Sequence, residues 1–95
     1  MIERHITFTV MPDMTEAFER FFAEDYRPPV TQVPGFITCE LLREIEQPDR
    51  YRMVFRWAHT EAAVAWRTSD VHQGLQPALN ALISSMEIVA YTTVA

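Results

Sequence analysis

Residues 31–66 constrain the fold of this chain most strongly, because three structural signals follow one another there in close succession. An amphipathic helical pattern ends in the turn signal Val33-Pro34-Gly35-Phe36. Two runs of alternating side chains, residues 36–45 and 51–57, then flank Gln47-Pro48-Asp49. Alternation with a period of two is typical of β-strands, and a turn sequence between two such runs favours a hairpin. We therefore predict a helix followed by two antiparallel strands.

The N-terminal part of the chain predicts a strand and then a helix. Residues 2–10 alternate between two sets of side chains, which are Ile6, Phe8 and Val10 on one face and His5, Thr7 and Thr9 on the other. Asp13, with Glu16 three residues later, predicts an N-cap and capping box, because the carboxylate can accept from free N–H groups of the first helical turn. Pro28-Pro29 is expected to end or kink this helix.

The C-terminal part predicts two further helical segments and a last strand. Thr60 is expected to cap a short helix over residues 61–68. Ser69 or Asp70 can cap a second segment, in which Pro77 either kinks the helix or starts a new one. An apolar stripe continues this helix, and residues 87–94 complete the pattern as a strand.

The resulting order, β-α-β-β-α-β, is that of the ferredoxin-like α+β fold, a four-stranded antiparallel sheet with its helices on one face. We expect residues 1–95 to form a single domain. The helices of one chain leave the opposite, partly apolar sheet face uncovered, and such a face needs a partner. A homodimer that packs the two sheets together as a dimeric α/β barrel is therefore expected.

Composition and charge exclude several classes of protein. The net charge is −5, and no cluster of basic residues is present that could follow a phosphate backbone, which argues against a nucleic-acid partner. No apolar run approaches the roughly 20 residues that cross a bilayer, and the N-terminus does not resemble a signal peptide, so a cytoplasmic location without a membrane partner is expected. The single cysteine, Cys39, forms no internal disulfide, no metal-ligand spacing occurs, and two glycines cannot supply a dinucleotide fingerprint.

Several short motifs occur in an order that resembles the antibiotic-biosynthesis-monooxygenase domain family over nearly the whole chain. The motifs are Val33-Pro34-Gly35-Phe36, Glu40-Leu41-Leu42-Arg43, Trp57 followed by Glu61-Ala62, Ala65-Trp66-Arg67-Thr68-Ser69, His72-Gln73 and Leu75-Gln76-Pro77-Ala78-Leu79. The resemblance implies a dimeric α+β barrel that oxidises a small aromatic substrate, such as a quinol, a phenol or a polyketide, with O2. It also implies that no metal, flavin or other cofactor is bound.

In such domains the substrate cavity lies within each subunit, between the helices and the sheet. The resemblance therefore makes His72 and His5 candidate catalytic bases, because the unperturbed pKa of histidine lies near neutrality. Trp66 is the candidate catalytic residue that positions the ring. The candidate substrate-binding residues are Phe18, Phe22 and Trp57. For both tryptophans, packing in a small core is the alternative interpretation.

Two branches of the family differ from this chain at positions implicated in their chemistry. Where polyketide monooxygenases have an asparagine and a tyrosine around the matching Trp57, this chain has Met53 and Ala63. Where the haem-degrading branch has an asparagine, a tryptophan and a histidine, this chain has His5, Trp66 and Gln76. Three functions are therefore weighed: a cofactor-independent monooxygenase, a non-catalytic small-molecule-binding dimer, and a haem-binding or haem-degrading protein.

Overall fold

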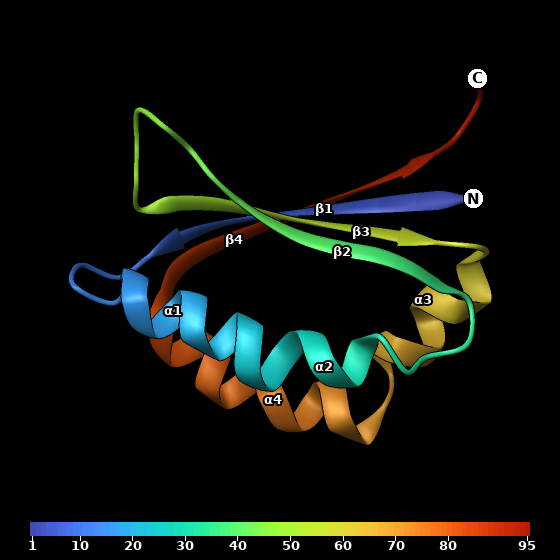
Figure 1. Cartoon of the computed structure of the whole chain (residues 1–95), viewed down its shortest axis with the longest axis horizontal. Coiled ribbons are helices and arrows are strands. Elements are labelled where there is room, and N and C mark those ends of the chain that lie inside the picture. Colours follow the sequence, from blue (N-terminus) through green and yellow to red (C-terminus); the bar gives the residue numbers. More distant parts are fainter.

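A computed structural model, which describes all of residues 1–95, shows a four-stranded antiparallel sheet with every helix on one of its faces (Figure 1). The elements, in chain order, are β1 (Ile2–Val10), α1 (Thr15–Phe21), the π-helix η1 (Phe22–Tyr26), α2 (Arg27–Val30), β2 (Phe36–Arg43), β3 (Arg50–Trp57), α3 (Thr60–Arg67), α4 (Asp70–Leu82) and β4 (Ile83–Thr92). The strand order across the sheet is β2-β3-β1-β4. The predicted ferredoxin-like α+β fold is confirmed.

The strand register divides the sheet into a buried inner face and an exposed outer face. On β1, Ile6 pairs with Met53 of β3 and with Ile88 of β4, and these side chains face the helices. His5, one residue earlier, pairs with Val54 and faces the other way. The core between the sheet and the helices contains seventeen buried residues, and all of them are hydrophobic. The alternation read from the sequence therefore separates the two faces correctly.

The N-terminal helical segment runs from α1 through η1 into α2 without a break in the chain direction (Figure 1). The predicted Asp13 cap is wrong: Asp13 has a left-handed φ of 64°, and the helix begins at Thr15 without a side-chain cap. Pro28-Pro29 does not end the helix. Proline lacks an N–H, and the chain widens to a π-turn just before the pair, where the Arg27 N–H bonds the Phe22 carbonyl five residues back.

The C-terminal helices are α3 and α4. The predicted Thr60 cap is wrong by one residue, because extended His59 occupies the N-cap position and its ring Nδ1 accepts from the Ala62 N–H at 3.3 Å. Ser69 does cap α4, since its hydroxyl oxygen accepts from the His72 N–H at 3.1 Å. Pro77 lies inside α4, which passes directly into β4 at Ile83, four residues before the predicted start of that strand.

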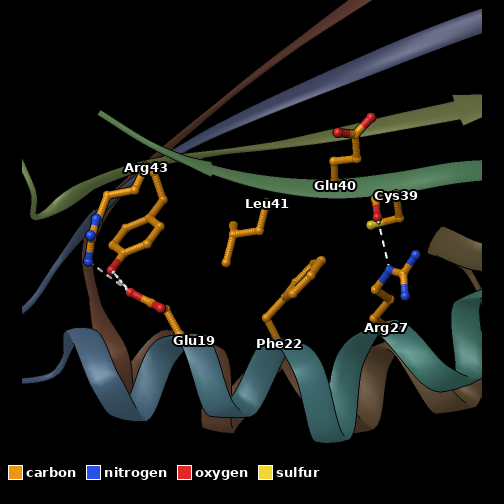
Figure 2. A pocket seen from close by; sticks show the side chains of 8 residues that line it. Glu19, Phe22, Arg27, Cys39, Glu40, Leu41 and Arg43 are labelled. Carbon is orange, nitrogen blue, oxygen red and sulfur yellow. Dashed lines mark hydrogen bonds and ion pairs between the residues drawn. The ribbon is translucent and has the colours of Figure 1, made fainter. Parts of the chain in front are cut away.

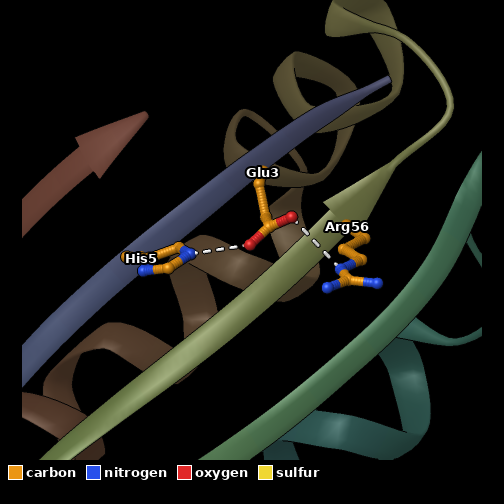
Figure 3. Close-up of polar contacts among 3 residues, drawn as sticks. All are labelled: Glu3, His5 and Arg56. Carbon is orange, nitrogen blue, oxygen red and sulfur yellow. Dashed lines mark hydrogen bonds and ion pairs between the residues drawn. The ribbon is translucent and has the colours of Figure 1, made fainter. Parts of the chain in front are cut away.

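The outer face of the sheet is not covered by any element of the chain (Figure 1). On this face Glu3 contacts two neighbouring side chains. One carboxylate oxygen contacts Nε2 of His5 at 2.8 Å and the other contacts Nε of Arg56 at 3.2 Å (Figure 3). The ring of Tyr91 packs edge-on against His5, with ring centroids 4.8 Å apart. None of the helices is long and apolar enough to cross a membrane.

Candidate functional site

A cavity of about 70 Å³ lies between the inner face of the sheet and the helices, and it is lined by twelve residues, of which eight are hydrophobic. Residues from β1, β3 and β4 form one side, and residues from η1, α3 and α4 form the other. The exposed members of the lining, Arg67, Met86 and Ile88, mark its mouth beside β4. Sites for drug-sized ligands have roughly 300–1,000 Å³. The cavity as formed therefore suits a small ligand.

Three rings form one wall of this cavity. His72 on α4 packs edge-on against Trp66 of α3, with ring centroids 5.1 Å apart, and against Tyr26 of η1 at 6.2 Å. Tyr26 and Trp66 are themselves nearly perpendicular, at 83° and 5.7 Å. Such edge-to-face pairs are favourable beyond the area they bury, and they hold the imidazole in one orientation. The π-turn places Tyr26 here, at the end of η1.

The surroundings of His72 favour its neutral form. Burial is the main cause of a lowered pKa for His72, and the positive charges of Arg4 and Arg67 lower it further, whereas the Arg67 backbone acts in the opposite direction. Its Nδ1 is buried, and no partner bonds it in good geometry. Its Nε2 lies 3.2 Å from the amide nitrogen of Gln76, which also lines the cavity. A ligand that exchanges a proton with Nε2 must therefore take the place of the Gln76 amide.

Two other groups of the cavity wall are chemically unusual. The indole Nε1 of Trp66 is buried without a hydrogen-bond partner, and buried N–H groups are seldom left so in native proteins. Burial raises the pKa of Tyr26 to about 12, although the nearby indole of Trp66 acts in the opposite direction. Tyr26 is therefore a neutral hydrogen-bonding group at every physiological pH. Neither group can act as a base, but both can orient a ligand.

The structure brings together two of the six catalytic and substrate-binding residues that were predicted from the sequence. Trp66 and His72 line the same cavity. Phe22 faces a different hollow, between the N-terminal helical segment and β2. Phe18 and Trp57 are fully packed in the core: the ring of Phe18 lies 4.9 Å from that of Tyr51, and the ring of Trp57 stacks on Phe55 at 5.6 Å.

His5 lies on the opposite side of the sheet from Trp66 and His72, because strand residues alternate in direction and β1 directs Arg4 and Ile6 to the cavity. The imidazole instead contacts Glu3 and Tyr91 on the outer face. His5 and His72 therefore cannot act on the same substrate within one subunit. The alignment of His5 with a cavity asparagine of the haem-degrading branch also loses its geometric basis.

Sequence reasoning missed Arg4, Tyr26 and Arg67, which line the cavity beside His72. Arg4 carried a usable signal, since it has the same strand phase as Ile6 and must share its face. Arg67 follows Trp66 directly on α3, and nothing in the sequence separates it from an ordinary surface arginine. The placement of Tyr26 depends on the π-turn, which no local pattern indicated.

The largest hollow of the molecule lies elsewhere, between the N-terminal helical segment and the edge strand β2 (Figure 2). It has a volume of about 560 Å³ and is open to solvent along the sheet edge. Most of its polar groups already pair: the Tyr51 hydroxyl donates to Glu19 at 2.6 Å, and Nε of Arg27 donates to the Cys39 carbonyl at 3.0 Å. The carboxylate of Glu40, which also lines the hollow, is exposed on β2. Because the smaller cavity holds a half-buried imidazole, we place the candidate site there.

Cys39 and the remaining acidic and imidazole groups form no metal centre. No cluster of three or more His, Cys, Asp or Glu side chains has the geometry to hold a metal ion. Cys39 is 1 % exposed, and burial raises the pKa of its thiol to about 12, so the thiolate needed for nucleophilic chemistry is scarce. Cys39 is a small core residue.

The fold and the sequence together define the class of protein. The profile of the antibiotic biosynthesis monooxygenase family matches residues 1–78, and the chain belongs to this family. No functionally curated protein matches the sequence. Solved structures resemble it over most or all of their lengths.

Three of these structures illustrate the likeness. A proposed antibiotic biosynthesis monooxygenase from Nitrosomonas europaea has a TM-score of 0.88 at 17 % identity and covers 100 % of both chains. One from Bordetella bronchiseptica has a TM-score of 0.87 at 24 % identity, covering 99 % of this chain and 97 % of the other. A variant of SnoaB, a cofactor-independent oxygenase from Streptomyces nogalater, has a TM-score of 0.88 at 25 % identity and covers 97 % and 91 %.

Proposed function

We propose that this protein is a cofactor-independent monooxygenase that oxidises a small phenol or quinol with O2. The observation that carries the proposal is the position of His72, a half-buried imidazole with a lowered pKa, on the wall of an apolar cavity beside Trp66. A histidine whose pKa is lowered is mainly neutral at pH 7 and is therefore available for proton abstraction. Family membership and the similarity to the oxygenase SnoaB support the same reaction class.

In the proposed reaction, Nε2 of His72 accepts the proton of a substrate hydroxyl, and Trp66 holds the ring by edge or face contact. A Gln76 amide that donates to Nε2 keeps the ring proton on Nδ1, and the substrate hydroxyl takes the place of that amide when it gives its proton to the Nε2 lone pair. The electron-rich anion then reduces O2. One oxygen atom enters the ring and the other leaves as water, and the ring supplies all four electrons, because a phenol is oxidised to a quinone and a quinol to a hydroxyquinone. The apolar lining excludes water from the intermediate.

Oxygen consumption by the purified, metal-free protein tests this proposal directly. A panel of quinols, catechols and anthrones should include at least one compound oxidised above the uncatalysed rate. His72→Ala should reduce that rate by about 10²- to 10⁴-fold, the usual loss for a general base. His5→Ala is the matched control, because His5 lies on the other sheet face, and its rate should be close to that of the parent. No consumption with any compound would refute the oxygenase proposal.

A non-catalytic small-molecule-binding protein is the second candidate function, and the small volume of the cavity favours it. Binding without turnover needs only the wall of Trp66, Tyr26 and His72, which is present. Haem does not fit the same site: the cavity of about 70 Å³ is far smaller than a porphyrin, and the Gln76 amide is not an axial iron ligand of the usual kinds. We therefore derive no step through haem.

We also propose that two copies associate through the outer sheet face. That face carries exposed apolar side chains, with Val89 41 % and Tyr91 51 % exposed, and none of the chain's helices covers it (Figure 1). Sedimentation at micromolar concentration should give about twice the 11.0 kDa chain mass. Val89→Glu should reduce the assembly to one copy, whereas Val71→Glu, on the exposed side of α4, should not. A parent protein that sediments as one copy would refute this proposal.

A further inference from the structure

The cavity beside His72 contains positive charge and no negative charge. Arg4 from β1 and Arg67 from α3 both line it, and none of the other lining residues is acidic. This is unexpected in a chain with thirteen acidic and eight basic residues. We propose that the ligand of this cavity is a small one-ring aromatic acid, whose carboxylate is held by Arg4 and Arg67 while its ring lies against Trp66. The proposal rests on the proposed function, because it names the substrate class of the same site.

The two arginines are not committed to partners within the protein. Arginines elsewhere on the sheet form ion pairs, such as Arg56 with Glu3 and Arg50 with Glu44. Neither Arg4 nor Arg67 has a carboxylate within ion-pair distance or a side-chain hydrogen bond. Arg67 is exposed and keeps its hydration, whereas the half-buried guanidinium of Arg4 loses part of its hydration without gaining a counter-charge from the protein. A bound anion would supply that counter-charge.

The charges of the two arginines also act on each other. Arg4 is half-buried, and both its burial and the nearby positive charge of Arg67 lower the pKa of its guanidinium. No neighbouring carboxylate offsets the repulsion between the two cations. Converging like charges beside a cavity raise the local concentration of ligands with the opposite charge. The arrangement therefore fits an anion as a ligand better than it fits the empty cavity.

The remaining wall favours a planar aromatic acid over a free inorganic anion. Trp66, Tyr26 and His72 present ring edges and faces, and small-molecule sites combine such apolar walls with a few polar groups. A guanidinium fork matches the two oxygens of a carboxylate. A volume of about 70 Å³ excludes more than one ring, and the exposed side chains at the mouth, Arg67 and Met86, must move to admit even one.

Calorimetric titration with a matched pair of probes tests this inference. We expect 2,5-dihydroxybenzoate to bind at least about tenfold more tightly than 2,5-dihydroxybenzamide, which has the same ring and no charge. Arg4→Gln and Arg67→Gln should each weaken benzoate binding by about 10- to 100-fold, the range of a lost charged hydrogen bond, and leave benzamide binding unchanged. Arg20→Gln, an exposed arginine on α1, is the control and should bind both compounds as the parent does.

The outcomes separate this inference from the proposed function. Equal affinity for acid and amide, or an affinity for inorganic phosphate that matches that for benzoate, would overturn the aromatic-acid assignment. Arginine-dependent benzoate binding without O2 consumption would support it and remove the oxygenase function. Oxidation of neutral quinols together with benzoate binding that is unaffected by both Arg4→Gln and Arg67→Gln would retain the oxygenase and refute the inference. Arg67 is exposed, so its variant keeps the test valid even where Arg4→Gln disturbs folding.

Discussion

Substitution of Gly35 by alanine should destabilise the fold through two separable effects. Gly35 has a φ of +90°, a conformation that costs an L-residue roughly 1–2 kcal/mol. A Cβ built there would lie 2.7 Å from Cβ of Ala62 and 3.2 Å from Nε2 of His59. The Ala62 Cβ is attached to the backbone of α3 and cannot rotate away, so the clash adds an overpacking cost of about 1–3 kcal/mol. The sum is about 2–5 kcal/mol.

A loss of that size is a large part of the roughly 5–15 kcal/mol that stabilises a typical domain. Urea unfolding followed by circular dichroism should therefore show a clearly lower midpoint for Gly35→Ala, with an unchanged slope. In an Ala62→Gly background, the same substitution meets no methyl group, and only the conformational cost and the weaker contact with the His59 ring should remain. The double-mutant cycle should then give a favourable coupling of about 1–3 kcal/mol between the two positions.

Gly74→Ala is the matched control for this experiment. Gly74 lies inside α4, and no atom lies within 4 Å of a Cβ built on it. Alanine should therefore stabilise the protein by about 0.5–1 kcal/mol through its higher helix propensity. A loss below about 1 kcal/mol for Gly35→Ala, or the absence of coupling to Ala62, would refute the reasoning that this turn is held against α3 by close backbone approach.

Three further outcomes follow from individual side chains. Cys39, whose thiol has a pKa raised to about 12 by burial, should react with iodoacetamide at pH 8 only after urea unfolding, and rapid labelling of the native protein would contradict its placement. Tyr51→Phe should cost about 1–2 kcal/mol in urea unfolding, because it removes the 2.6 Å hydrogen bond to the half-exposed Glu19 carboxylate; an unchanged midpoint would show that this bond adds nothing. Burial lowers the pKa of His72 below its unfolded value near 6.5, so the unfolded state binds more protons at this residue. The free energy of unfolding should therefore fall as the pH drops through 6.5. In acid unfolding, His72→Gln should make that decline less steep.

The order of elements could be predicted because it depends on local periodicity. Residues 2–10 and 51–57 alternate with a period of two, and each alternation required one face to be buried. The ends of the helices were harder to predict. The Asp13 and Thr60 caps failed because the dihedral angles of the preceding turn decide which residue occupies the cap, and a left-handed Asp13 or an extended His59 is a tertiary outcome.

The candidate site was predicted only in part, because membership of a core does not distinguish a wall from a filled interior. Phe18 and Trp66 are both large, buried and on helices, yet only Trp66 borders empty space. That difference depends on how α3, α4 and η1 meet, and the π-turn before Pro28 changes the helical phase there. Arg4 was overlooked because a charged side chain in a strand is usually assigned to solvent, although its phase placed it with Ile6.

The charges around His72 link ligand binding to the strength of the base. In the free protein, burial is the main cause of the lowered pKa of His72, and the positive charges of the Arg4 and Arg67 side chains lower it further. A carboxylate bound between these arginines would cancel much of their field, so the pKa of His72 should be higher in the complex than in the free protein. The acid limb of kcat/KM reports the free protein and that of kcat reports the complex. With a benzoate substrate, the limb of kcat should therefore lie at higher pH than that of kcat/KM, whereas with a neutral quinol the two should nearly coincide. Coincident limbs for the benzoate would show that the arginines do not hold its charge near the imidazole.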